Sequence, residues 1–252
     1  MNDARAAVSD PRWGQLGRDR KAEAILSTMQ LHCGCDLAGG TWLDIGCGSG
    51  GISATLSSHV NHVVGVDPEP WQRWDDFRSQ HANLEFHVGT YRVLDALLGG
   101  RSCDVVICNQ VYEHVDDPVA LLRAIHAVMK PGARCYFAGP NLLWPIEPHV
   151  FWPFVHWLPR MFAQRCMRVL GSKQSRDLDA WSWSYWKLAR AFRNAGFVYS
   201  SAIRARLRAE AGTGRSAVAR TLGRMPKGVF SMLTPFSPAF VFVLRRREDA
   251  GT

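Results

Sequence analysis

The chain has 252 residues, of which 47% are hydrophobic and 21% are charged, so it can bury a full core and has the composition of an ordinary globular protein. Its first residues lack the apolar stretch of a signal peptide, so we expect none. The seven cysteines contain no C-x-x-C pair, so their spacing argues against a zinc site. We expect them to be reduced thiols in a cytoplasm.

The formal net charge of +8 is distributed unevenly along the chain. Residues 1–159 carry 12 Lys and Arg against 17 Asp and Glu, a net charge of −5, whereas residues 160–247 carry 18 against 3, a net charge of +15. A basic segment attracts anions such as phospholipid headgroups, nucleic acid or a phosphorylated substrate. A solvated face without a partner would give the same composition.

Apolar residues at helical spacing predict a short amphipathic helix over residues 19–32, within an N-terminal helical cap that spans 1–40. From residue 41 onwards, strand-like and helix-like segments alternate. We expect strands at 41–46, 62–67, 83–90, 103–110 and 133–141, and helices at 50–60, 68–80 and 117–130. This alternation predicts a parallel sheet with helices on both faces.

The alternation breaks after the fifth predicted strand. Residues 142–183 form an insert that is rich in proline and aromatic residues, and we expect it to act as a lid. The pattern then resumes with a helix at 185–194 that ends at Gly196, a strand at 197–206, a basic insertion at 207–235 and a closing strand at 238–247. Alternation along the strand at 197–206 would place Arg204, Arg206 and Arg208 on one face.

A glycine-rich turn follows the first predicted strand in the stretch Trp42-Leu43-Asp44-Ile45-Gly46-Cys47-Gly48-Ser49-Gly50-Gly51. Glycines let the backbone approach a ligand closely, and the helix that follows offers free N–H groups. Asp67 ends the second strand, where a carboxylate can accept hydrogen bonds from both hydroxyls of a ribose. Asn109 and Gln110 end the fourth strand, across the point where the strand order would reverse.

The spacing Gly46-x-Gly48-x-x-Gly51 also fits a nicotinamide-dependent dehydrogenase. Asp44 argues against that interpretation, because a carboxylate in front of the glycines would repel a pyrophosphate and attract an ammonium or sulfonium group. We therefore expect a cationic cofactor with a ribose, and S-adenosylmethionine has these features.

Four segments in this order, LDIGCGSGG, VVGVD, DVVICNQVYEHV and LLRAIHAVMKPGARCYFAGPN, resemble the class I S-adenosylmethionine-dependent methyltransferases, in particular those that act on small molecules and lipids. The resemblance covers residues 41–141, with a weaker similarity at 185–197. It implies an α/β, Rossmann-like, doubly wound sheet of seven strands in the order 3-2-1-4-5-7-6, with strand 7 antiparallel. The chain would be a single methyltransferase domain, in which 41–141 form the cofactor-binding core and 184–252 add a C-terminal helix and strands.

The resemblance also implies roles for individual residues. Asp44, Gly46, Gly48 and Gly50 would surround the methionine part of the cofactor, with Cys47 among the cofactor-binding residues; Asp67 would hold the ribose, Pro68 would lie near the adenine, and Asn109 and Gln110 would lie near the donor methyl group. Many relatives carry an acidic residue after the glycine that follows strand 3, whereas this chain has Gly89-Thr90-Tyr91. Thr90 or a backbone carbonyl would then contact the adenine amino group. No metal is expected.

Methyl transfer from a sulfonium is an in-line displacement, and a general base is needed only where the acceptor must lose a proton, as a hydroxyl does. His114, after the fourth strand, and Glu147 and His149, in the insert, are the candidate catalytic residues. Each has a structural alternative, since His114 could cap a turn and the other two could belong to a rigid turn between prolines.

The leading hypothesis is methyl transfer to a small-molecule, lipid-like or glycan acceptor, with oxygen as the favoured atom. The aromatic insert and the basic residues after it suit a lid or a patch that contacts an anionic membrane surface, although the aromatic residues could equally form only the core of the lid. An RNA methyltransferase and a non-catalytic S-adenosylmethionine-binding protein are the alternatives; nucleic acid ranks lower because no RNA-binding module is evident. We expect a cytoplasmic protein, with attachment to the cytoplasmic face of a membrane and the oligomeric state left open.

Overall fold

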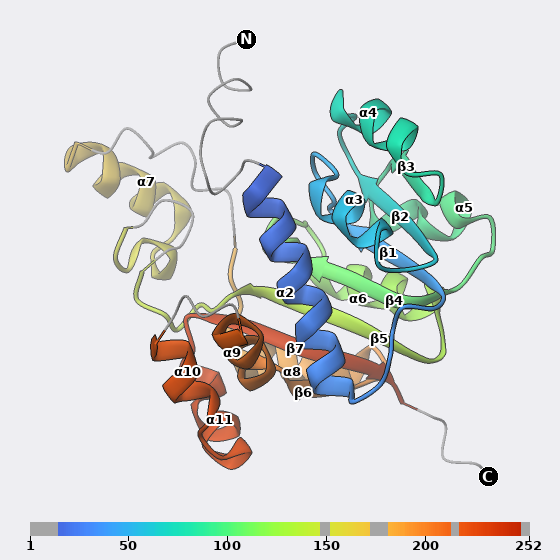
Figure 1. Cartoon of the computed structure of the whole chain (residues 1–252). Coiled ribbons are helices and arrows are strands. Elements are labelled where there is room, and N and C mark those ends of the chain that lie inside the picture. The colour runs from blue at the N-terminus through green and yellow to red at the C-terminus, as the bar shows by residue number, and fades with distance from the viewer. Residues whose placement is uncertain (1–14, 147–151, 172–180, 213–216, 248–252) are drawn as a thin grey trace.

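The computed structural model describes residues 15–146, 152–171, 181–212 and 217–247, and its centre is a seven-stranded sheet (Figure 1). The strands are β1 (Thr41–Ile45), β2 (His62–Asp67), β3 (Leu84–Val88), β4 (Cys103–Asn109), β5 (Met129–Pro140), β6 (Phe197–Ser201) and β7 (Ala239–Arg246). They lie in the order β3-β2-β1-β4-β5-β7-β6, and β7 is antiparallel to both of its neighbours. The predicted fold class and strand order are therefore confirmed.

Helices cover both faces of this sheet. The described helices are α2 (Gln15–Cys33), α3 (Gly51–Ser57), α4 (Arg73–Gln80), α5 (Leu94–Leu98), α6 (Pro118–Val128), α7 (Arg160–Val169), α8 (Tyr185–Asn194), α9 (Ile203–Gly212), α10 (Ala217–Gly223) and α11 (Lys227–Leu233), with short 3₁₀ turns η1 (Tyr91–Val93), η2 (Val155–Trp157) and η3 (Thr234–Phe236). One apolar core packs the sheet against α5, α6 and α8, and a second packs it against α2, α3 and α4. Successive residues of β1, Trp42 and Leu43, are fully buried in opposite cores, as expected for a strand covered on both faces.

Local capping explains why two predicted helices begin and end where they do. The carboxylate of Asp117 accepts the backbone N–H groups of Val119 and Ala120, each at 3.0 Å, and Pro118 occupies the first turn of α6. Gly196 has a φ of +86° just beyond α8, a conformation that favours glycine. Both boundaries agree with the sequence prediction.

Two predicted segments are wrong in part. The helix expected at 68–80 begins only at Arg73, because the carboxylate of Asp67 accepts the backbone N–H of Glu69 and the indole N–H of Trp71 and holds the first residues in a turn. The fifth strand begins at Met129 rather than 133, since Met129 pairs with Cys103 before an irregularity in the ladder.

The strand expected at 197–206 is also too long. β6 ends at Ser201, the N–H of Ala202 donates to the carbonyl of Val241 at 2.7 Å, and the good helix formers that follow make α9. Arg204, Arg206 and Arg208 therefore do not share a face. Arg206 turns towards Glu210, with which it forms an ion pair at 2.8 Å, whereas residues 204 and 208 lie one helical turn apart.

The insert after β5 is anchored to the core at its two ends. The buried side chain of Asn141 donates to the carbonyl oxygens of Pro235 and Ser237, at 2.9 and 2.8 Å, and the N–H of Trp183 donates to the hydroxyl of Tyr112 at 3.2 Å. Between these anchors, η2 and α7 form a small apolar cluster of their own from Val155, Ala163 and Met167, with Trp152 packed against it. Within the part of the chain that the structure describes, no helix combines the length and apolarity needed to cross a bilayer.

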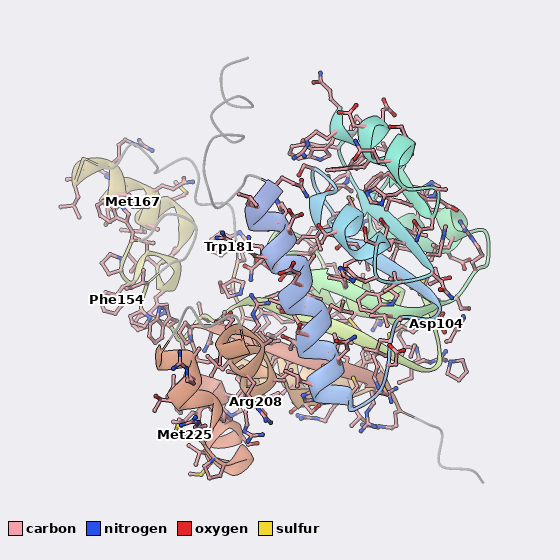
Figure 2. All side chains as sticks on the ribbon, viewed as in Figure 1. Asp104, Phe154, Met167, Trp181, Arg208 and Met225 are labelled. Carbon is pink, nitrogen blue, oxygen red and sulfur yellow. The ribbon has the colours of Figure 1, made fainter. Side chains whose placement is uncertain are left out.

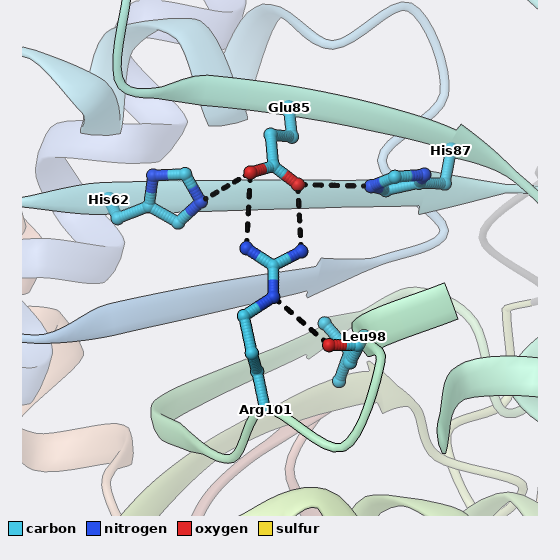
Figure 3. Close-up of polar contacts among 5 residues, drawn as sticks. All are labelled: His62, Glu85, His87, Leu98 and Arg101. Atoms are coloured by element: carbon cyan, nitrogen blue, oxygen red, sulfur yellow. Dashed lines mark hydrogen bonds and ion pairs between the residues drawn. The ribbon is translucent and has the colours of Figure 1, made fainter. Parts of the chain in front are cut away.

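A cluster of ionisable side chains ties β3, at one edge of the sheet, to the neighbouring segments (Figure 3). The carboxylate of Glu85 receives two hydrogen bonds from the guanidinium of Arg101, at 3.1 and 2.9 Å, and lies 3.1 and 3.2 Å from the Nε2 atoms of His62 and His87. Chiefly because of the hydrogen bonds from Arg101, the pKa of Glu85 is lowered to about 2.

This lowered pKa predicts acid sensitivity. The ionised carboxylate stabilises the fold above its unfolded pKa of 4.5, and this contribution is lost as the pH falls towards 2. We expect Glu85→Gln to lower the free energy of unfolding at pH 7 modestly, because the group is partly exposed, and to reduce the loss of stability between pH 5 and pH 2.5. Urea denaturation across this range measures both effects, with Glu23→Gln, an exposed site on α2, as the control. Equal pH dependence of Glu85→Gln and the wild type would contradict the assignment.

Candidate functional site

A cavity of about 440 Å³ lies at the carboxyl ends of β1, β2 and β4, where the strand order reverses between β1 and β4. It is lined by Ile45, Gly46, Val66, Asp67, Pro68, Gly89, Thr90, Tyr91, Arg92, Gln110, Val111, His114, Val115 and Asp116. Six of the residues selected from the sequence are therefore at one cavity: Gly46, Asp67, Pro68, Thr90, Gln110 and His114.

The glycine turn is fixed to β2 by its backbone. The N–H groups of Gly46 and Cys47 both donate to the carbonyl oxygen of Val66, at 2.8 and 3.2 Å. Gly46 has a φ of +70°, and a Cβ atom there would come within 2.6 Å of the Val111 side chain. At Gly48, with a φ of +52°, a Cβ would meet no atom within 4 Å, so the turn leaves open space at that position.

Asp67 joins the turn to the cavity wall. One carboxylate oxygen accepts the N–H of Gly48 at 2.8 Å, and the other accepts the N–H of Glu69 and the indole N–H of Trp71 at 3.1 and 3.3 Å. The predicted placement of this carboxylate at the end of β2, facing the site, is therefore found.

Trp74 is a supporting residue that sequence reasoning missed. Its indole N–H donates to the carbonyl of Gly48 at 2.9 Å, and its ring stacks on Phe86 with the ring centroids 5.0 Å apart. A Cβ atom on Gly50 would come within 2.5 Å of the Phe86 ring, so glycine is required at that contact. The two tryptophans of the segment Trp71-Gln72-Arg73-Trp74 could have indicated such a role. Only the structure shows that the Trp74 indole bonds the glycine turn and the Trp71 indole bonds Asp67.

Asp44 and Cys47 lie behind the cavity wall rather than in it. Asp44 is 3% exposed, and the hydroxyl of Ser53 donates to its carboxylate at 2.7 Å. Burial raises the pKa of Asp44 to about 6, against the opposing effects of the Ser53 hydrogen bond and the charge of Arg18. Burial likewise raises the pKa of the Cys47 thiol well above its usual value.

The segment after β3 is cross-linked to the loop after β4 around the cavity. The hydroxyl of Tyr91 donates to one oxygen of Asp116 at 2.8 Å, and the guanidinium of Arg92 donates to the other at 2.6 Å. The hydroxyl of Thr90 accepts the N–H of Arg92 at 3.3 Å and so caps η1. Asp116 is a cavity carboxylate that the sequence analysis missed, because Asp116-Asp117 could be interpreted only as the start of a helix.

At the other side of the cavity, Gln110 has a φ of +59°, which is uncommon for a residue other than glycine. Its N–H donates to the carbonyl of Ala138 at 2.8 Å, and its exposed side chain lines the cavity, as does the exposed imidazole of His114. Asn109 does not line it. The other two candidate catalytic residues, Glu147 and His149, lie outside the described residues. Among the described residues, no group of His, Cys, Asp and Glu side chains is arranged to hold a metal ion.

Comparison with known proteins identifies the family of this chain. A family model described as a methyltransferase domain matches residues 17–202. A ubiquinone biosynthesis O-methyltransferase of Acinetobacter baylyi is 31% identical over 143 residues, which cover 54% of this chain and 59% of the relative. The protein of the same name from Hahella chejuensis is 35% identical over 109 residues, which cover 42% and 45%. The chain thus matches about half the length of these curated relatives.

Solved structures with this fold cover most of the chain. The plantazolicin methyltransferase BamL, solved in complex with a triazolic desmethylPZN analogue and SAH, aligns with a TM-score of 0.58 at 13% identity over 92% of this chain and 85% of that one. A Burkholderia thailandensis 1,6-didemethyltoxoflavin-N1-methyltransferase aligns with a TM-score of 0.56 at 18% identity, over 98% of this chain and 83% of that one. The [4+2]-cyclase SpnF aligns with a TM-score of 0.53 at 13% identity, over 88% of this chain and 80% of that one. At these identities the likeness shows the fold alone.

The raised pKa of Asp44 predicts a pH dependence of S-adenosylmethionine binding. Below about pH 6 the carboxyl group is protonated in the free protein, so a cation near the turn gains less from it; above that pH the ionised group attracts the cation. Affinity measured by calorimetry should therefore rise from pH 5 to pH 7, and Asp44→Asn should flatten this rise. Asp95→Asn, on α5, is the control. A flat profile for the wild type would refute the role of this carboxylate.

Proposed function

The chain belongs to the class I S-adenosylmethionine-dependent methyltransferases, and from this premise we propose that it methylates a hydroxyl group of a small, lipid-like acceptor. The observation that carries the proposal is the cavity at the switch point of the sheet, which brings the carboxylate of Asp67 and the imidazole of His114 to one site. S-Adenosylmethionine supplies the electrophilic methyl group, and the chain supplies the positions of donor and acceptor.

The residues present fit this cofactor. The cavity of about 440 Å³ is of the size that holds small-molecule ligands, and the open space at Gly48 lies beside the Asp67 carboxylate. In the proposal, Asp67 accepts hydrogen bonds from the ribose hydroxyls while its second oxygen keeps the bonds to Glu69 and Trp71 that fix its orientation. Pro68 and Thr90 line the adenine side, and Gln110 faces the donor methyl group.

His114 is the proposed general base. Its side chain is exposed at the cavity rim, and an imidazole can take the proton that a hydroxyl acceptor loses as the methyl group arrives. The relatives are named as O-methyltransferases, which supports oxygen as the methylated atom. Because the chain matches only about half of their length, their acceptor is not assigned to this chain.

A methyl-transfer assay with radiolabelled S-adenosylmethionine and lipophilic phenols tests this function. We expect Asp67→Ala to weaken cofactor binding at least tenfold, since it removes the ribose acceptor. We expect His114→Ala to keep cofactor affinity and to lower kcat about a hundredfold, because it removes only proton transfer.

The alternatives give distinct results in the same assay. Label recovered in RNA after lipids are removed would identify an RNA methyltransferase. Cofactor binding without label in any lipid, glycan or RNA extract would identify a non-catalytic binding protein. An unchanged kcat in His114→Ala would remove this residue as the base and leave positioning as the source of catalysis.

We also propose that the insert rests on an anionic membrane surface, which would place the protein at the cytoplasmic face of a membrane. Figure 1 shows α7 set apart from the sheet, and Figure 2 labels Phe154 and Met167 in this region. Large apolar side chains are exposed on η2 and α7: Phe154, Trp157, Leu158, Met161, Phe162, Val169 and Leu170. The exposed Arg165 and Arg168 lie on the same helix, so apolar and cationic groups are combined as in interfacial helices.

Vesicle flotation tests the membrane proposal. Phe162 is 66% exposed, so Phe162→Asp should leave the fold intact and reduce flotation with phosphatidylglycerol vesicles severalfold. Leu16→Asp, a substitution at a 71% exposed site on α2, should float like the wild type. Equal flotation of Phe162→Asp and Leu16→Asp would rule out the insert as the contact.

A further inference from the structure

A second cavity, of about 580 Å³, lies among the C-terminal end of α2, β6, α9 and the α11–η3 segment. It is lined by Leu31, His32, Tyr185, Tyr199, Ser200, Ser201, Arg204, Ala205, Arg208, Phe230, Ser231 and Thr234. Among the described residues, none lines both this cavity and the cofactor cavity. The methyltransferase reaction proposed above makes no use of it.

The lining of this cavity is cationic. Arg204 and Arg208 lie one turn apart on α9, and among the described residues no Asp or Glu lines the cavity. The Nε of Arg204 donates to the carbonyl of Met225 at 2.8 Å, which fixes the orientation of that guanidinium. Arg208, labelled in Figure 2, is exposed and makes no hydrogen bond or ion pair within the described residues. Glu210, the acidic residue on the same helix, pairs with Arg206 instead.

Hydroxyl and imidazole groups lie beside the two guanidinium groups. The Nε2 of His32 lies 2.7 Å from the hydroxyl of Ser200, and the hydroxyl of Ser231 is also at the wall. The two guanidinium groups together carry more N–H donors than one carboxylate can accept, and they suit the several oxygens of a phosphate group.

The rest of the wall is apolar and continues onto the surface. The rings of Tyr185 and Phe230 line the cavity, and Leu31 is 52% exposed at its edge. Next to Ser231 on α11, Met232 and Leu233 are 79% and 52% exposed. A bound molecule would therefore meet cationic donors inside the cavity and apolar side chains around it.

We propose that this cavity binds an amphiphile whose phosphate-containing headgroup carries a net negative charge, with the phosphate group on Arg204, Arg208 and Ser200 and the apolar part against Phe230 and Leu31. The proposal stands independently of methyl transfer, since it concerns a separate cavity. It gives a specific ligand chemistry to part of the positive charge that the sequence concentrates after residue 160.

Calorimetry on the full chain tests this site with soluble short-chain lipids. Dihexanoyl phosphatidylglycerol should bind, whereas zwitterionic dihexanoyl phosphatidylcholine should bind at least tenfold more weakly. Arg208→Ala should lower the affinity for phosphatidylglycerol about tenfold, the loss expected for a charged hydrogen bond. Arg220→Ala, which removes the same charge from an exposed site on α10 outside the cavity, should change it less than twofold.

The other results overturn the proposal. Equal binding of the two lipids would show that the cavity does not select a headgroup with a net negative charge. Inorganic phosphate that binds as tightly as the lipid would identify a site for free phosphate rather than for an amphiphile. Equal losses in Arg208→Ala and Arg220→Ala would indicate attraction to net charge alone. Thermal unfolding and S-adenosylmethionine affinity are measured for each variant, so that a folding defect or a failure of the cofactor site is recognised separately.

Discussion

The carbonyl oxygen of Val66 is the contact on which the cofactor site depends. It accepts the N–H groups of both Gly46 and Cys47, so the turn after β1 is fastened to the end of β2. This pairing requires a left-handed backbone at Gly46, and the close approach of Val111 leaves no room there for a side chain. The open space at Gly48 and the orientation of Asp67 both follow from where this turn is held.

The buried carboxyl group of Asp44 lowers the stability of the fold when it is ionised. Asp44 is buried directly beneath the turn, where desolvation favours its protonated form and only Ser53 and Arg18 oppose that effect. A carboxyl group with a pKa of about 6 can change its charge in response to a nearby cation near neutral pH. If the proposed role of Asp44 holds, a cationic cofactor is favoured over a pyrophosphate by a carboxyl group that does not line the cavity.

The predictable part of the molecule is the part whose signals are local. The strand–glycine–helix motif at 41–51, the carboxylate at Asp67 and the cap at Asp117 each depend on neighbours within a few residues, and the structure places them as expected. The order of the strands followed from the family resemblance rather than from any local pattern.

The other features were not predicted, either because one local pattern is compatible with two structures or because the feature depends on contacts between distant segments. The helix expected from residue 68 starts late because the Asp67 carboxylate competes for the backbone, and the arginines of α9 were assigned to a strand because alternation alone does not distinguish a short strand from a helix start. The roles of Trp74 and Asp116 arise from contacts across 26 and 25 residues, respectively.

The arginines in the basic half of the chain lie in two different environments. Arg206 forms an ion pair with Glu210 and a hydrogen bond with the hydroxyl of Tyr136 beside the core, so its charge is paired within the fold. Arg208, two residues later and turned to the opposite side of the same helix, has no such partner among the described residues. Net charge therefore overstates the cationic surface, and the arginines available to an anionic ligand are those that the helix period directs away from the core.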